Sequence, residues 1–265
     1  MTQRSKFRNF LDALRAFLFF DPLIYVYTLA MGTLSLLSSF FDKHGSIQHW
    51  FARSWSWLIL KTIFSPVEVI GRENIPGGPA VYAANHQSAM DIPLLYTNLP
   101  MQFRIIAKLE LFKYPFMGWH LRRSGQIPID ETDMRSNLRS IQRAVETVKS
   151  GMPVVVFPEG GRSPDAVIRD FKPGAFRIAT KAGVPIIPMA IVGTFEVLRM
   201  NSFVIRPGRL QLVIGQPITA EGYANRELDK LSDRVKAAIE DMYYSRAKTP
   251  RPDPESANTT VAKSS

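Results

Sequence analysis

The sequence predicts an α/β fold with a largely parallel mixed sheet flanked by helices, preceded by an N-terminal membrane-embedded helical hairpin. After residue 65, short β-branched runs alternate with segments of helical periodicity, which is typical of a largely parallel sheet. Before it, residues 22–41 contain twenty residues without a charged side chain. As a helix this stretch is about 30 Å long, enough to cross a bilayer core. We therefore divide the chain into a membrane-associating segment (1–65), one α/β domain (66–245) and a disordered tail (246–265).

The N-terminal segment has two apolar parts, residues 10–20 and 22–41, which meet at Asp21 and Pro22. Because proline breaks or kinks a helix, we expect two helical pieces. Four basic residues on the N-terminal flank favour a cytoplasmic start: Arg4, Lys6, Arg8 and Arg15. A single span would put the rest of the chain outside, so we favour a hairpin that dips into the cytoplasmic leaflet and keeps the α/β domain on the cytoplasmic face.

Residues 47–64 combine Trp50, Trp55 and Trp57 with interleaved basic residues. Such a helix suits the headgroup level of a membrane, where aromatic rings are enriched. A helix packed in the protein core is the alternative, since aromatic residues are often simply buried.

The α/β region contains strand-like runs at residues 67–70, 80–84, 103–107, 126–129, 153–157, 185–192 and 210–214. We expect the last run to form a hairpin with residues 203–205. Two helices have one apolar face each. Their faces comprise Met134, Leu138, Ile141, Val145 and Val148 in the first, and Leu228, Leu231, Val235, Ile239 and Met242 in the second.

Composition limits the possible functions. The 33 Lys and Arg against 23 Asp and Glu give a net charge of +10, which fits an anionic partner such as nucleic acid, a phospholipid surface or a phosphorylated substrate. A nucleic-acid partner is not expected, because no binding motif is recognisable and the uncharged stretch has no use there. The absence of cysteine excludes thiolate chemistry, and the four histidines have no metal-ligand spacing, so we expect no metal.

The first chemistry-bearing motif follows the buried run at residues 80–84. His86 and Asp91 lie in a loop after this run, at the end of the strand where open α/β sheets bind ligands. A tight turn would let Asp91 hold one imidazole nitrogen while the other takes a proton from an alcohol. A polar loop histidine next to an aspartate that caps a helix is the alternative, and for an isolated motif of this length it is the more common case.

The second motif follows the strand-like run at 153–157. Its loop carries Glu159, Gly160, Gly161 and Arg162. Glycines allow close backbone approach to a ligand, and an arginine binds phosphate with two hydrogen bonds. Glu159 could brace the histidine loop; a surface ion pair of Glu159 and Arg162 is the alternative.

Together NHQSAMD (85–91) and FPEGGRS (157–163) resemble the H-x4-D and F-P-E-G-T-R-S motifs of the glycerol-3-phosphate and lysophosphatidate acyltransferase family. Two further blocks are similar to that family's A-K-x-E-L to I-D-R stretch and to its V-P-I-x-P-V motif. They occupy residues 107–130 and 184–191. In order and spacing the resemblance covers about residues 66–215, and it makes residues 66–245 a catalytic domain.

The resemblance implies roles for several residues: His86 as the general base, Asp91 as its orienting partner, Lys108 and Arg162 as contacts for the acceptor's phosphate, Glu159 and Gly160 as shapers of the loop, and Pro188 on the acyl-donor side. Two departures from the family pattern stand out. Gly161 replaces the usual threonine, which loosens the loop. Glu131 stands where an arginine is usual, so Arg135 or Arg122 is expected to supply the missing phosphate contact.

The expected reaction is transfer of a fatty acyl group from acyl-CoA or acyl carrier protein to the sn-2 hydroxyl of 1-acyl-glycerol-3-phosphate, giving phosphatidate, with no cofactor. The partners are then membrane phospholipid, a lysophospholipid acceptor and the acyl donor. Transfer to another lysolipid and a non-enzymatic module that binds anionic lipid are the alternatives. A row of arginines at helical spacing (135, 139 and 143) fits a solvated helix face better than a headgroup-facing stripe.

Overall fold

The computed structural model describes residues 6–42, 44–130, 132–223 and 227–252. Its sheet has the order β1-β7-β6-β2-β5-β3-β4, and all pairs are parallel except β6 with β7. The predicted, largely parallel sheet is confirmed. Its strands are β1 (Val67–Ile70), β2 (Val81–Ala84), β3 (Arg104–Lys108), β4 (Ile127–Ile129), β5 (Val154–Val156), β6 (Ile186–Val192) and β7 (Leu210–Ile214).

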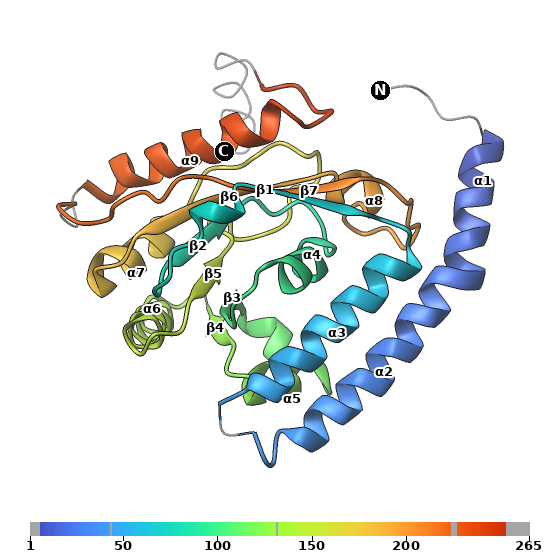
Figure 1. Ribbon diagram of the computed structural model, residues 1–265, viewed down its shortest axis with the longest axis horizontal. Helices are drawn as coiled ribbons and strands as arrows, with labels where there is room; N and C mark the ends of the chain where they lie inside the picture. The colour runs from blue at the N-terminus through green and yellow to red at the C-terminus, as the bar shows by residue number, and fades with distance from the viewer. Residues whose placement is uncertain (1–5, 43, 131, 224–226, 253–265) are drawn as a thin grey trace.

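Helices cover both faces of the sheet (Figure 1). They are α1 (Lys6–Arg15), the π turn η1 (Ala16–Phe20), α2 (Asp21–Ser38), α3 (Ser46–Thr62), η2 (Arg72–Asn74), α4 (Asp91–Asn98), η3 (Leu109–Lys113), α5 (Met117–Arg123), α6 (Met134–Lys149), α7 (Gly174–Ala182), α8 (Thr194–Val197) and α9 (Leu228–Tyr244). One apolar core lies between the sheet and α6, α7 and α9, and a second lies on the other face under α3 and α4.

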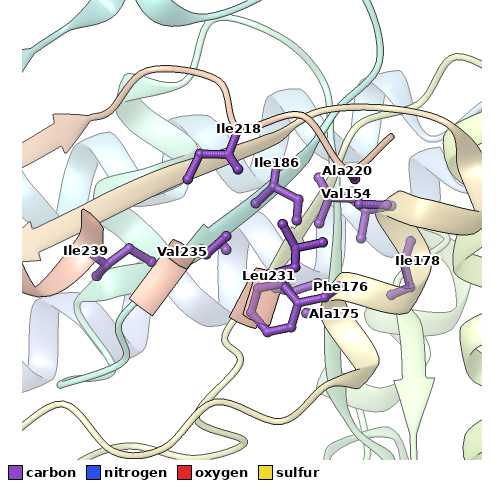
Figure 2. Close-up of a cluster of buried hydrophobic side chains, with 14 of the residues drawn as sticks. Val154, Ala175, Phe176, Ile178, Ile186, Ile218, Ala220, Leu231, Val235 and Ile239 are labelled. Atoms are coloured by element: carbon purple, nitrogen blue, oxygen red, sulfur yellow. The ribbon is translucent and has the colours of Figure 1, made fainter. Parts of the chain in front are cut away.

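The periodicity of α9 accounts for much of the first core. Leu231, Val235 and Ile239 lie on one helix face, and all three belong to the core cluster that also contains Ile186 of the sheet and Phe176 of α7 (Figure 2). All five side chains are almost completely buried. The predicted apolar face of α9 is therefore confirmed.

The N-terminal helix runs without a break from Lys6 to Ser38, so the predicted break at Asp21 and Pro22 is wrong. The physical reason is the π turn before the proline, in which the Asp21 N–H donates to the carbonyl of Ala16. Proline lacks an N–H and crowds the preceding turn, and a widened turn absorbs both defects. Within the described residues this is the one helix long and apolar enough to cross a membrane, and only 6% of its most apolar stretch is buried.

The reversal that makes a hairpin comes later, between α2 and α3, which lie side by side (Figure 1). Asp42 starts α3 by accepting hydrogen bonds from the N–H groups of Ser46 and Gln48, and Gly45 turns the chain with φ +70°. Trp50 and Trp57 are exposed on α3, whereas Ile59 and Leu60 are buried against the sheet. The predicted core-packing face of α3 is therefore observed, whereas contact of its exposed Trp face with a membrane stays a prediction.

Two contacts fasten the long helix to the α/β domain. Asp12 of α1 is buried and pairs with Arg206 at 3.4 Å, in the segment before β7. Ser35 of α2 is hydrogen-bonded to His120 Nδ1 of α5 at 3.0 Å. Phe20, between them, is fully buried in the second core.

Two further expectations are wrong. Residues 203–205 form no strand, and β7 instead pairs with β1 and β6. The pairing with β1 begins where the Leu210 N–H donates to the Pro66 carbonyl, directly before β1. Met134 and Leu138 of α6 are exposed, since only the later turns of this helix reach the sheet. Residues 253–265 of the predicted tail lie outside the described residues.

Candidate active site

The candidate site lies where three neighbouring parallel strands end. Strands β3, β5 and β2 are adjacent in the sheet, so their carboxyl ends share one edge. Lys108 is the last residue of β3, the FPEGGRS loop follows β5, and His86 follows β2. The strand order thus brings together residues that are far apart in the sequence, at the edge where open α/β sheets bind ligands.

His86 and Asp91 form a close pair, with 2.7 Å between His86 Nδ1 and Asp91 Oδ2. The same oxygen also accepts the backbone N–H groups of Gln87 at 2.7 Å and Ser88 at 3.0 Å. A carboxylate oxygen only accepts, so Nδ1 carries the proton of this hydrogen bond, and in a neutral imidazole the lone pair is then on Nε2. Asp91 is fully buried, while 17% of the His86 side chain is exposed. The pair can therefore take a proton from a molecule that approaches from outside.

Glu159 braces the histidine loop, as the sequence suggested, and the surface ion pair with Arg162 is not formed. Its Oε1 accepts the His86 N–H at 2.7 Å, and its Oε2 accepts the Arg169 N–H at 2.9 Å. The Ser163 N–H also donates to the His86 carbonyl at 2.8 Å. Burial raises the pKa of Glu159 to about 7, and the two N–H groups act in the opposite direction.

Sequence reasoning missed two side chains that hold His86. Phe157 stacks on the imidazole with 4.1 Å between ring centroids. Asn85 is fully buried, donates to the Ile191 carbonyl at 2.9 Å and accepts the Ile191 N–H at 2.7 Å. Both flank motif residues in the sequence, but only the pairing of β2 with β5 and β6 shows what they contact.

Two basic residues lie at the same edge of the sheet as the pair, Lys108 at the end of β3 and Arg162 in the loop after β5. Lys108 and Arg162 are both exposed, and a Cβ on Gly161 would lie 3.7 Å from Lys108 Nζ. Lys108 therefore reaches the FPEGGRS loop, and within the described part of the chain neither cation has an ion-pair partner. Gly160 has φ +72°, and its N–H donates to the Phe157 carbonyl, a tight turn that suits glycine.

The remaining predicted residues are placed less directly. Arg135 is exposed in the first turn of α6. Pro188 is buried in the middle of β6, where a Cβ on Gly215 would lie 3.0 Å from its ring, so its contact with an acyl donor stays a prediction. Glu131 lies outside the described residues. No group of three or more His, Asp or Glu side chains suited to a metal occurs in the described ranges.

A buried carboxylate orients a partly exposed imidazole at the edge of an α/β sheet where ligands bind, an arrangement that suits general-base chemistry. The sequence agrees, since residues 66–192 match the family described as Acyltransferase.

Curated relatives identify the family more closely. The chain is 36% identical over 203 residues to a 1-acyl-sn-glycerol-3-phosphate acyltransferase from Chlamydomonas reinhardtii, covering 75% of this chain and 59% of that protein. A protein of the same name from Pseudomonas aeruginosa is 31% identical over 194 residues, 73% of this chain and 74% of its own length. The chain spans less than two thirds of the algal relative. It belongs to the 1-acyl-sn-glycerol-3-phosphate acyltransferase family.

A solved structure agrees. The 1-acyl-sn-glycerophosphate (LPA) acyltransferase PlsC from Thermotoga maritima has a TM-score of 0.70 and 31% identity, over 89% of this chain and 97% of that one. At this coverage the similarity includes at least part of the N-terminal segment as well as the α/β domain.

Proposed function

We propose that this protein transfers a fatty acyl group from acyl-CoA or acyl carrier protein to the sn-2 hydroxyl of 1-acyl-glycerol-3-phosphate, giving phosphatidate. The observation that carries the proposal is the His86 and Asp91 pair, whose second imidazole nitrogen is free to act as a base. The names of the relatives support the choice of acceptor and product.

In the proposed mechanism, His86 Nε2 takes the proton of the sn-2 hydroxyl as its oxygen attacks the thioester carbonyl. Asp91 stabilises the imidazolium that forms. The tetrahedral intermediate then collapses, the carbon–sulfur bond breaks, and the imidazolium returns its proton to the leaving thiolate. The balance is one ester made and one thioester consumed, and no cofactor is needed.

The acceptor's phosphate is proposed to bind Lys108 and Arg162. Both are exposed at the carboxyl edge of the sheet, and arginine binds phosphate through two parallel hydrogen bonds. Arg135 is a further candidate contact from α6. Glu159 shapes the loop that carries Arg162 by accepting the N–H groups of His86 and Arg169. Gly160 contributes the tight turn with φ +72°, and Gly161 precedes Arg162 in the same loop.

Attachment to one membrane leaflet, with the catalytic domain on the cytoplasmic face, is part of the proposal. The helix from Lys6 to Ser38 is apolar and largely unburied, which supports contact with lipid. Its contacts through Asp12 and Ser35 tie both ends of this helix to the α/β domain, and a helix crossing the bilayer alone would lose them.

The test is transfer of a labelled acyl group from acyl-CoA, and in parallel from acyl carrier protein, to lysophosphatidate by detergent-purified protein. We expect phosphatidate from the wild type and a loss of several orders of magnitude in kcat for His86→Ala. Near-normal turnover by His86→Ala would overturn the base assignment. Product only with another lysolipid would change the acceptor, and no product with any donor and acceptor would reject the proposed reaction.

A further inference from the structure

A second apolar surface lies outside the N-terminal helix. Five large side chains of η3, α5 and the turn between them are between 37% and 58% exposed: Leu111, Tyr114, Phe116, Met117 and Trp119. We call this group the η3–α5 patch. Several exposed aromatic residues close together mark an interaction site rather than an ordinary surface.

The backbone at Phe116, in the centre of the patch, has a positive φ angle. Phe116 has φ +58° and ψ −61°, and the Met117 N–H donates to the Pro115 carbonyl at 2.6 Å, which together make a γ-turn with positive φ. This turn is rare and strained for a bulky residue. Gly118 allows it, because a Cβ there would lie 2.2 Å from the Phe112 carbonyl. Strain of this kind is typically found at functional positions.

The patch is continuous with the end of the apolar helix α2. Arg123 of α5 lies over the ring of Phe40 at 5.0 Å, and the hydrogen bond between Ser35 and His120 joins the same two segments. Phe40 and Phe41 are strongly exposed. In Figure 1, α5 lies beside the end of α2. The exposed apolar surface thus extends from α2 onto the α/β domain.

The charge around the patch fits a phospholipid surface. Lys113, Arg122 and Arg123 are exposed, while η3 and α5 contain one acidic residue, Glu110. Aromatic rings at the headgroup level with basic residues beside them are typical of protein surfaces that bind anionic membranes. A soluble partner would not account for the continuity with α2.

We propose that the η3–α5 patch inserts into the surface of an anionic phospholipid bilayer, as a membrane contact of the α/β domain in addition to that of the N-terminal helix. The first residue of the patch, Leu111, follows Lys108, the candidate contact for the acceptor's phosphate, by three residues in the sequence. Insertion there brings the carboxyl edge of β3 to the lipid surface, so that a lysolipid reaches the site without leaving the headgroup layer. This consequence rests on the proposed function, whereas insertion itself does not.

The absence of cysteine allows a direct test. Phe116→Cys is labelled with an environment-sensitive fluorophore and mixed, as full-length protein, with phosphatidylcholine vesicles containing an anionic phospholipid and a brominated lipid. Val26→Cys on the exposed side of α2 is the positive control, and Arg139→Cys on α6, on the other face of the sheet, is the negative control. We expect a blue shift and bromine quenching at 116 and 26 but not at 139.

A label at 116 that behaves like the label at 139, while 26 inserts, would overturn the proposal. A shift at 116 that depends on protein concentration without vesicles would also overturn it, because it would indicate contact between copies of the chain. These readouts do not need catalysis, so they distinguish failure of this proposal from failure of the proposed reaction.

A second variant tests the consequence for the acceptor. Phe116→Gly removes the ring but suits the positive φ, so we expect the fold to be kept, with an unchanged circular dichroism spectrum. We expect KM for long-chain lysophosphatidate in vesicles to rise at least fivefold, and kcat/KM for a soluble short-chain acceptor to stay unchanged. An equal effect on both acceptors would refute delivery through the patch.

Discussion

Asp91→Asn is expected to slow acyl transfer without disrupting the His86 loop. Oδ2 of Asp91 accepts three donors, His86 Nδ1–H and the backbone N–H groups of Gln87 and Ser88. An asparagine oxygen in the same position accepts all three. The two N–H groups repel the amide NH2, so they hold the amide in this orientation and His86 keeps its tautomer.

The magnitude follows from the lost charge. A hydrogen bond to a charged group contributes about 1.5–3 kcal/mol and a neutral one about 0.5–1.5 kcal/mol. The difference of about 1–2 kcal/mol applies to the imidazolium that forms in the transition state, and it lowers kcat about 5- to 30-fold. Asp91→Ala instead leaves two buried backbone N–H groups without a partner, which lowers the free energy of unfolding by about 2–6 kcal/mol.

The assay is kcat at saturating acceptor, together with denaturant unfolding of each variant. Asp133→Asn is the matched control, because Asp133 also accepts two backbone N–H groups, at the start of α6 and on the surface. Asparagine caps a helix as well as aspartate does, so we expect little change there. Loss of activity in Asp91→Asn as large as in His86→Ala would refute the view that the two backbone groups fix the orientation.

Three further outcomes are expected. Asn85→Ala lowers the free energy of unfolding by about 2–4 kcal/mol, because both backbone groups of Ile191 lose their partner in the sheet. As the pH rises from 4.5 to 7, the free energy of unfolding of the wild type falls by about 3 kcal/mol, because burial raises the pKa of Glu159 to about 7 and the folded protein keeps a proton that the unfolded chain releases. Glu159→Gln lacks this proton, so its free energy of unfolding rises by about 3 kcal/mol relative to that of the wild type over the same range. Arg162→Ala raises KM for the acceptor about 10- to 100-fold, and Lys149→Ala on α6 does not.

For each of these three variants, one result would contradict the prediction. An unchanged unfolding midpoint for Asn85→Ala would show that water replaces the amide. A pH-independent difference between wild type and Glu159→Gln would show that the carboxyl group is ionised throughout. Equal KM values for Arg162→Ala and Lys149→Ala would remove the phosphate role of Arg162.

The local parts of the fold could be predicted from the sequence. Runs of β-branched residues mark the strands because side chains of this shape fit a buried sheet, and the spacing of Leu231, Val235 and Ile239 marks a helix face because three to four residues complete a turn. Two short motifs after strands were enough to predict that His86 and Glu159 lie together, because parallel strands share a carboxyl edge.

The errors concern contacts between distant segments. Nothing near Leu210 in the sequence indicates that it pairs with the strand after Pro66. The sequence therefore favours a hairpin with the nearby residues 203–205. Met134 is exposed because α6 starts beyond the sheet, which depends on the position of the edge strand β4. Pro22 normally breaks a helix, and only the π turn before it explains why this one continues.

The same limit applies to the site. The sequence motifs name His86, Asp91 and Glu159, but the contacts of Asn85 and Phe157 depend on which strands are neighbours. These two residues fix the position of the histidine loop rather than its chemistry. Motif spacing carries information on the reacting groups and little on the groups that support them.

The π turn limits how the length of the N-terminal helix can vary. A π turn is an α-helical turn with one extra residue, so the helices on its two sides keep the angular relation of a continuous α-helix. Loss of one residue within Ala16–Phe20 would therefore leave Asp12 facing Arg206 and Ser35 facing His120. Loss of one residue from α2 would turn α1 by about 100° and separate the ion pair. Between Asp12 and Ser35, a one-residue deletion that keeps both contacts is thus confined to the π turn.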